Sequence, residues 1–337
     1  MHSPVPKGKG PAAPSSWSGK GAGTGASHHS VKSSQSWKWR DSLLVISGSA
    51  IGEILNGQLP PKIGKYEITA KLGSGGESDV YRAIDDLGRE VAIKMFVSGF
   101  SEKPDLAQRF IVELRSVIAA LGTHPNLVAH CDVGEDGGNP YVVMQVVEGE
   151  PLDRIIRDRR ASLTEKLSII VQVCFALGHG HQRGISHSDL KGANVWVQTG
   201  DHVKVLDLGV DHAWRVCSVP HRFTHVNPYM SPESWRSVPG QQHFDKRSDI
   251  FSIGVLLYYL LTGKYPFGLP RTEMIFLTLR EPHTPLSASL TSYPAALDAI
   301  LDRALAKKPE DRFATAEEFA GDLGLVISEL EKDSLRG

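Results

Sequence analysis

The sequence is poor in cysteine, with three thiols among 337 residues, at Cys131, Cys174 and Cys217. An odd number of widely spaced cysteines forms neither a disulfide framework nor a CxxC metal pattern, which indicates a reducing compartment. We expect all three to be buried thiols. The sequence also lacks an apolar run long enough to cross a bilayer, and its N-terminus lacks the apolar core of a secretory signal. These absences predict a cytoplasmic protein without a membrane span.

The chain has almost no net charge, because 37 Lys and Arg residues face 38 Asp and Glu residues. No global field attracts it to nucleic acid, and we expect no nucleic-acid partner. No acidic residue precedes Asp41, whereas basic residues recur in a stretch of Ser, Gly and Pro. Such a composition cannot bury enough apolar surface to offset its ordering entropy. We predict a disordered basic segment over residues 1–60, either a solvated tail or, given Trp17, Trp37 and Trp39, a segment that docks a partner.

The character of the sequence changes near Gly149. Before it, short β-branched or aromatic runs predict strands over residues 66–72, 80–84, 91–96 and 141–147. Apolar residues from Leu106 to Leu121 recur every three or four positions and predict one helix between the third and fourth strands. After Gly149 the predicted elements are mainly helices, over residues 163–181, 248–262, 295–306 and 316–330. This order predicts an α+β fold of two lobes with a cleft between them.

A glycine-rich run joins the first two predicted strands, Leu72-Gly73-Ser74-Gly75-Gly76-Glu77-Ser78-Asp79-Val80. A dinucleotide fingerprint requires a helix after the glycines, so this placement argues against one. In a β-hairpin, residues without side chains let backbone amides lie over phosphate oxygens. Glycine-rich hairpin tips are common, so an ordinary turn stays open as the alternative.

Lys94 ends the third predicted strand, directly after Val91-Ala92-Ile93. A cation beside apolar residues is costly unless an anion meets it. A surface lysine is the alternative, but Glu113 on the predicted helix is a candidate partner. A movement of that helix would make or break the pair.

The most specific stretch is His187-Ser188-Asp189-Leu190-Lys191-Gly192-Ala193-Asn194, followed by Asp207-Leu208-Gly209. Phosphoryl transfer needs a carboxylate to accept the proton of the attacking hydroxyl, a cation near the transferred group, and oxygen ligands for Mg²⁺. Asp189, Lys191, and the pair of Asn194 and Asp207 supply these groups. Hard oxygen ligands of this kind suit Mg²⁺ rather than zinc.

In this order and spacing the residues resemble the signature of the eukaryotic-like (Hanks-type) serine/threonine protein kinases. The matching motifs are the glycine-rich loop, VAIK, a helix αC glutamate, HxDLKxxN, DxG and an APE-like Ser231-Pro232-Glu233. The resemblance extends from Tyr66 to about Leu330. It implies a small antiparallel β-rich N-lobe with one αC helix over residues 61–147, a larger helical C-lobe over 148–332, and a short tail over 333–337.

The resemblance also implies an ATP site. Its residues would be Leu72, Gly73, Ser74, Gly75, Gly76, Val80, Ala92, Lys94, Glu113, Met144, Gln145 and Val147. Lys94 would hold the α and β phosphates and would pair with Glu113 when the αC helix is swung in. Met144 would be the gatekeeper, and Gln145 and Val147 would offer backbone groups to adenine.

For the chemistry, the resemblance implies that Asp189 is the catalytic base and that Lys191 steadies the γ phosphate. The ligands of Mg²⁺, with Mn²⁺ as a substitute, would be Asn194 and Asp207. The structural residues would be Glu233 paired with Arg312, and Asp249. Asp249 would anchor the catalytic loop, residues 187–194. The expected activity is transfer of the γ-phosphate of ATP to Ser/Thr hydroxyls of protein substrates.

Six positions depart from the family pattern. Ser78 stands where the third glycine is usual, and Leu208 replaces the usual Phe after the metal-binding Asp, both tolerable changes. The other four bear more on activity. Ser188 replaces the arginine that usually precedes the catalytic Asp and receives a phosphate on the activation segment, so we do not expect switching by that route. Val226 replaces a threonine usually bonded to the catalytic Asp and Lys, Trp196 lies at the adenine position where a smaller residue is usual, and His130 replaces an aliphatic residue. These departures support an alternative, a pseudokinase or scaffold that binds nucleotide with little or no transfer. A related fold that phosphorylates a small metabolite is the third interpretation.

Overall fold

The structure is a computed structural model of the chain. It describes residues 59–97, 99–100, 102–158, 161–219, 226–236 and 245–335. Apart from its last two residues, the predicted N-terminal segment 1–60 lies outside this part of the chain. In the part described, we find no helix that is both long and apolar enough to cross a membrane.

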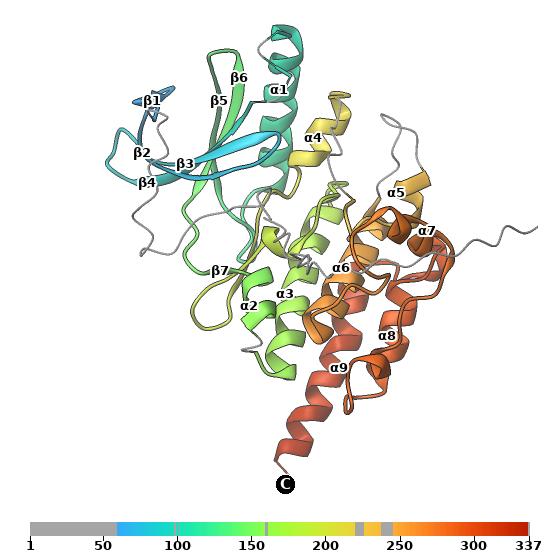
Figure 1. Cartoon of the computed structure of the whole chain (residues 1–337). Helices are drawn as coiled ribbons and strands as arrows, with labels where there is room; N and C mark the ends of the chain where they lie inside the picture. Colours follow the sequence, from blue (N-terminus) through green and yellow to red (C-terminus); the bar gives the residue numbers. More distant parts are fainter. Residues whose placement is uncertain are drawn as a thin grey trace, which may run out of the picture. The chain divides into compact units, whose positions relative to one another are not determined.

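A six-stranded antiparallel sheet is formed by strands that lie within residues 62–145 (Figure 1). The strand order is β1-β2-β3-β4-β6-β5. The bounds are β1 Lys62–Ile63, β2 Tyr66–Ser74, β3 Ser78–Ile84, β4 Glu90–Phe96, β5 His130–Asp136 and β6 Asn139–Gln145. Four of these strands overlap the predicted runs, and they are the ones rich in β-branched and aromatic residues.

Strand β5 was not predicted, because its sequence is mostly polar and only Val133 is buried. It lies at the edge of the sheet, where one row of side chains faces solvent. Cys131 on this strand is exposed. The prediction of three buried thiols is therefore wrong at Cys131, although Cys174 and Cys217 are buried.

Helix α1 (Pro104–Leu121) joins β4 to β5 and packs on β5 and β6. Proline near its first turn favours helix initiation there, because the missing N–H has no partner in a helix N-terminus. Its buried residues form one stripe, which includes Phe110, Leu114, Val117 and Leu121. The helix predicted from this periodicity is confirmed, and Glu113, next to the buried stripe, is half-buried.

The rest of the described chain is mainly helical (Figure 1). The helices are α2 Leu152–Asp158, α3 Leu163–His181, α4 Val210–Val216, α5 Pro232–Arg236, α6 Lys246–Thr262, α7 Thr272–Arg280, α8 Ala296–Ala304 and α9 Ala316–Ser334. Helix α6 is the centre of this part, because nearly all of its residues are buried and it packs on α3, α8 and α9. A small sheet is formed by β7 (Glu150–Pro151), β8 (Val195–Val197) and β9 (Val203–Val205). Strands β8 and β9 lie in the sequence between the predicted catalytic loop, residues 187–194, and α4.

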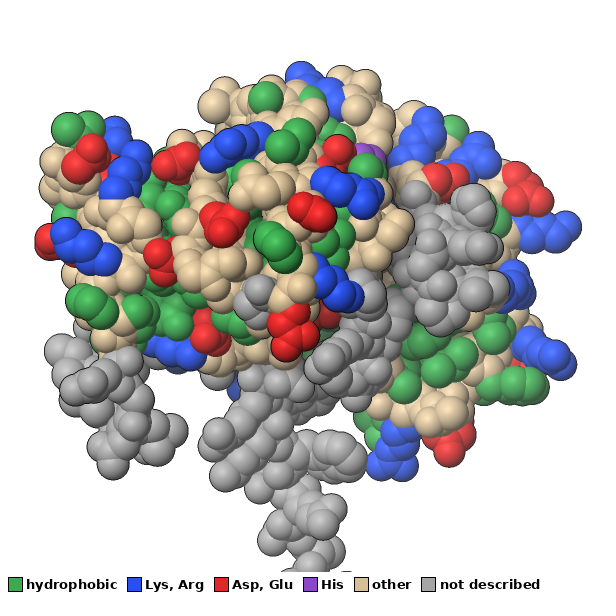
Figure 2. Space-filling view, turned by 90° about the horizontal axis from the view of Figure 1, so that it is seen from above, with side chains coloured by type: hydrophobic (Ala, Val, Ile, Leu, Met, Phe, Trp, Pro, Cys, Tyr) green, Lys and Arg blue, Asp and Glu red, His purple; other side chains and the backbone are tan. Residues whose placement is uncertain are grey.

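Local signals explain the long helices. Helix α3 matches its predicted bounds, because Ser162 and Glu165 form a reciprocal capping box at its start. The short helices α2, α4, α5 and α7 were not predicted. The α+β fold class is confirmed, whereas the exact division into lobes at residues 147 and 148 stays a prediction. Basic and acidic side chains are interspersed on the face in Figure 2, in keeping with the balanced charge.

Candidate active site

The glycine-rich run forms the turn between β2 and β3, as predicted. The Gly75 N–H donates to the Ser78 carbonyl over 2.8 Å, and the Ser74 hydroxyl donates to Asp79 Oδ1 over 2.6 Å. A Cβ atom added at Gly76 would meet no atom within 4 Å. The protein itself therefore does not require glycine at this position, which leaves room for close approach of a ligand to the backbone.

Five of the predicted ATP-site residues belong to one buried apolar cluster, namely Leu72, Val80, Ala92, Met144 and Val147. Trp196 of β8 belongs to the same cluster and is 1% exposed, with its indole N–H donating to the Ala193 carbonyl over 3.2 Å. The Gln145 backbone N–H donates to the Ala129 carbonyl. The Gln145 N–H predicted to meet adenine therefore already has a partner within the protein.

Lys94 and Asp207 form an ion pair across 113 residues of sequence, with 2.7 Å between Nζ and Oδ2. Their side chains are 16% and 13% exposed. Burial raises the pKa of the Asp207 carboxyl, but the charge and hydrogen bond of Lys94 outweigh this and hold the pKa below its ordinary value. Asp207 is therefore a carboxylate at neutral pH.

In this structure the partner of Lys94 is Asp207 and not Glu113, which the sequence had suggested. The reason is the position of α4, which directly follows Asp207-Leu208-Gly209 and packs on α1. Burial is the main influence on the pKa of His212 and of Cys217 at this helix, lowering the first and raising the second, and the charge of Glu113 raises both. The pair of Lys94 with Glu113 thus needs a different placement of α1 relative to α4.

Helix α4 contacts aromatic residues at β4 and α1 on one side and the catalytic loop on the other. Trp214 is 2% exposed, and its ring centroid lies 5.3 to 5.7 Å from those of Phe96, Phe100 and Phe110. Arg215, the next residue, donates to the hydroxyls of Ser186 and Ser188, the former over 2.9 Å. A guanidinium from α4 therefore contacts the loop at the position where the family's usual arginine is missing.

The Asp189 carboxylate has a donor at each oxygen. Lys191 Nζ lies 2.7 Å from Oδ2, and Asn227 Nδ2 lies 3.2 Å from Oδ1. Burial raises the pKa of Asp189, but the charge and hydrogen bond of Lys191 outweigh this and lower it overall. The Asn194 amide donates to the Asp189 backbone carbonyl over 2.9 Å. The sequence assigned no role to Asn227.

The Asp249 carboxylate of α6 accepts hydrogen bonds from the backbone of the catalytic loop. Its Oδ1 accepts from the Ser188 N–H over 2.8 Å, and its Oδ2 accepts from the His187 N–H over 2.7 Å and from His181 Nε2 over 2.8 Å. Ser188 adopts a φ of 70°, a conformation that non-glycine residues rarely take without support from their surroundings. The buried carboxylate provides that support.

Glu233 and Arg312 form a bidentate pair, with both oxygen–nitrogen distances at 2.8 Å. The Arg312 side chain is completely buried. Glu233 also accepts from the Ser248 hydroxyl, which ties α5 to the start of α6. The pair fixes the segment after the catalytic loop onto the helical core.

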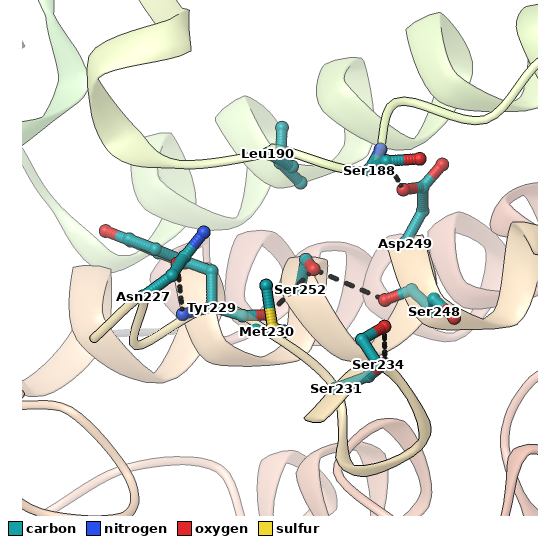
Figure 3. Close-up of a pocket in the computed structure, with 10 residues that line it drawn as sticks. All are labelled: Ser188, Leu190, Asn227, Tyr229, Met230, Ser231, Ser234, Ser248, Asp249 and Ser252. Atoms are coloured by element: carbon teal, nitrogen blue, oxygen red, sulfur yellow. Dashed lines mark hydrogen bonds between the residues drawn. The ribbon is translucent and has the colours of Figure 1, made fainter. Parts of the chain in front are cut away.

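Ten residues line a narrow polar hollow between the catalytic loop and α6 (Figure 3). Its serine hydroxyls already have protein partners: Ser231 and Ser234 bond each other at 2.7 Å, and Ser252 donates to the Tyr229 carbonyl. The hollow is therefore a polar packing contact between the loop and α6, and its hydroxyls do not call for a ligand.

The comparisons with known proteins agree with this geometry. Residues 66–322 match the family model described as the protein kinase domain. The chain belongs to the protein kinase family. A probable serine/threonine-protein kinase of Corynebacterium efficiens is 38% identical over 277 residues, which cover 78% of this chain and 41% of that protein. The serine/threonine-protein kinase PknB of Mycobacterium tuberculosis is 36% identical over 272 residues, or 77% of this chain and 42% of that protein.

A crystal structure of the Mycobacterium tuberculosis PknI kinase domain matches with a TM-score of 0.60 and 26% identity, covering 78% of this chain and 97% of that chain. The chain spans about two fifths of the length of the curated relatives named here. The expected Hanks-type serine/threonine kinase catalytic domain is thus confirmed. Members of this family use ATP and a divalent metal ion.

The donor set of the kinase domain fits a divalent cation held together with phosphates. Asn194 and Asp207 supply an amide and a carboxylate, and the low pKa of Asp207 keeps the latter ionised. In the described ranges we find no group of three or more His, Cys, Asp or Glu side chains suited to a metal.

Proposed function

We propose that the chain is an ATP-dependent protein serine/threonine kinase. The observation that carries the proposal is the pairing of Lys94 with Asp207 and of Lys191 with Asp189, each at 2.7 Å. The two pairs contain residue types that phosphoryl transfer requires, and the first joins segments 113 residues apart in the sequence. The names of the relatives support the same activity.

In the proposed reaction a substrate hydroxyl attacks the γ-phosphorus of ATP, its proton passes to Asp189, and the bond to the β-phosphate oxygen breaks to release ADP. Asp189 is ionised at neutral pH because its pKa is held below the ordinary value, and its side chain is 32% exposed, so a substrate hydroxyl can reach the carboxylate. Lys191 would steady the γ phosphate, and Lys94 would hold the α and β phosphates under the glycine-rich turn.

We propose Mg²⁺ as the metal, with Mn²⁺ as a substitute, held by Asn194 and Asp207. When bound, the ion supplies positive charge at the phosphates. In this structure Lys94 donates to one oxygen of Asp207, and the Asn194 amide donates to the Asp189 backbone carbonyl. The hydrogen bond to Asp189 uses the side-chain nitrogen of Asn194, so the side-chain oxygen of Asn194 is the atom left for a cation.

The proposed substrates are proteins, and Lys191 with the relatives favours Ser and Thr over Tyr. The docking role of the N-terminal segment concerns residues outside the described part of the chain. It stays a prediction, as do the cytoplasmic location and the absence of a nucleic-acid partner. Nothing in the comparisons or the site geometry favours the pseudokinase alternative, since Lys94, Asp189 and Asp207 are all retained.

The test is incubation of the purified chain with ATP and Mg²⁺ and a mixture of proteins, followed by mass spectrometry of the phosphorylated residues. We expect phosphoserine and phosphothreonine with the wild type and with Asp86→Asn, a matched change at an exposed turn. We expect none with Asp207→Ala. Wild type as silent as Asp207→Ala while still binding ATP would support the scaffold alternative, and phosphotyrosine alone would overturn the substrate class.

A further inference from the structure

Asp189 is held by side chains from two separate parts of the chain. Lys191 comes from the same loop, but Asn227 lies 38 residues further on, in the segment that leads to α5. The two donors contact different oxygens of the carboxylate. Each carboxylate oxygen has a second lone pair, so both contacts leave an acceptor site for a substrate hydroxyl.

The Asn227 side chain is itself fixed. Its Oδ1 accepts a hydrogen bond from the Tyr229 N–H over 3.0 Å. Turning the amide over would place its oxygen against the Asp189 carboxylate and its NH₂ against an N–H group, so the hydrogen bonds define its orientation. Tyr229 is buried, and its carbonyl accepts from the Ser252 hydroxyl of α6 over 2.8 Å (Figure 3). A continuous set of contacts therefore runs from α6 through Tyr229 and Asn227 to Asp189.

Lys191 alone cannot define the plane of the carboxylate. Rotation about the last bond of an Asp side chain is broad, and an ammonium group on a flexible stem is a point charge with rotatable donors. A second, planar donor on the other oxygen removes this freedom. The neighbouring Val226 has no hydrogen-bonding group in its side chain, so it cannot do this.

We propose that Asn227 is the positioning residue for Asp189, orienting the carboxylate from the segment that precedes α5. This inference rests on the proposed function, since it assigns to Asn227 the task of aiming the proposed base. It predicts that the orientation of the Asp189 carboxylate depends on the conformation of the segment that carries Asn227 as well as on the catalytic loop.

The kinetic test compares Asn227→Ala and Asn227→Asp with the wild type in the full chain, with Val226→Ala as the matched control on the adjacent residue. A hydrogen bond to a charged group contributes about 1.5–3 kcal/mol, so Asn227→Ala should lower kcat about 10- to 160-fold. We expect the KM for ATP to stay within about twofold, because Asn227 contacts the base and no predicted ATP residue. Val226→Ala should keep kcat within about threefold, given its lack of a polar group.

The pH profile separates positioning from a structural role. A carboxylate at position 227 would lie beside Asp189, and like charges raise a carboxyl pKa. In Asn227→Asp the acid limb of the kcat/KM profile should therefore move to higher pH, by about one unit. A merely structural role would lower the melting temperature and leave this limb where it is, and that result would overturn the proposal.

A third measurement does not depend on activity. In wild-type protein with ¹³C-labelled aspartate and ¹⁵N-labelled asparagine, the Asn227 side-chain amide resonances should shift with the same apparent pKa as the Asp189 carboxyl, assigned from Asp189→Asn. If the protein transfers no phosphate, the proposed function fails, but this titration still decides whether the contact exists. Amide resonances of Asn227 that do not respond to the titration of Asp189 would overturn the inference.

Discussion

The pair of Glu233 and Arg312 offers the sharpest prediction of stability. The guanidinium donates to both carboxylate oxygens and also to the backbone carbonyls of Ala306, Arg247 and Lys307. It is completely buried, whereas the Glu233 side chain is 20% exposed. Replacing Arg312 therefore leaves a mostly buried carboxylate without its cation and several carbonyls without a donor.

The expected cost follows from this geometry. Removing one partner of a buried ion pair destabilises a protein by about 3–5 kcal/mol, because the remaining charge stays desolvated. For domains of 150–250 residues each kcal/mol corresponds to about 2–4 °C in melting temperature. Arg312→Ala should thus lower the melting temperature by roughly 6–20 °C. Arg312→Lys keeps the charge but cannot bind both oxygens in a fixed fork. Its melting temperature should therefore lie between those of wild type and Arg312→Ala.

The assay is thermal and urea unfolding of wild type, Arg312→Ala, Glu233→Gln and the double variant. In the double variant no charge is stranded, so it should be less destabilised than the sum of the single changes, with a coupling of about 0.5–3 kcal/mol. A fall of less than about 2 °C in Arg312→Ala, or single effects that simply add, would refute the reasoning.

Three further changes test other parts of the site. Asp249→Asn offers one acceptor oxygen to two buried backbone N–H groups, so it should cost about 1–3 kcal/mol in urea unfolding, and a wild-type midpoint would contradict this. Burial lowers the pKa of His130 to about 4. The unfolded chain titrates near 6.5, so stability should fall as the pH drops from about 6.5 towards 4, by at most about 1.4 kcal/mol per pH unit. His130→Leu should flatten that slope, and an unchanged slope would argue against the assignment. At Gly209 φ is 87° and an added Cβ would lie 2.3 Å from Val117 Cγ1; Gly209→Ala should therefore cost about 1–3 kcal/mol in the same assay, and a neutral result would show that α1 moves freely.

Strong local signals explain which elements could be predicted from sequence. Helix α3 begins at a capping box and carries a long apolar pattern, so its predicted bounds agree with the structure. Strand β5 was missed because an edge strand needs few apolar residues, and Val133 is the only buried one. Helix α4 has seven residues, and it depends on the contacts of Trp214 with rings from distant segments, which no local pattern reveals.

The residue types of the candidate site were evident in the sequence, but their partners were not. The sequence allowed Lys94 to meet Glu113, and the structure pairs it with Asp207 because of how α4 packs on α1. Asn227 was missed because a single asparagine before a proline normally indicates a turn. Its contact with Asp189 depends on the folding of residues 226–236 onto α6, which is a tertiary effect.

The most direct test of the account is a single-turnover measurement of γ-phosphate transfer with Asp189→Asn, alongside nucleotide binding by the same protein. The account predicts nucleotide affinity within about threefold of wild type, because Asp189 does not hold ATP, and a transfer rate at least about 100-fold lower, as expected when a general base is removed. Transfer by Asp189→Asn at the wild-type rate would contradict the central claim that this carboxylate accepts the proton of the substrate hydroxyl.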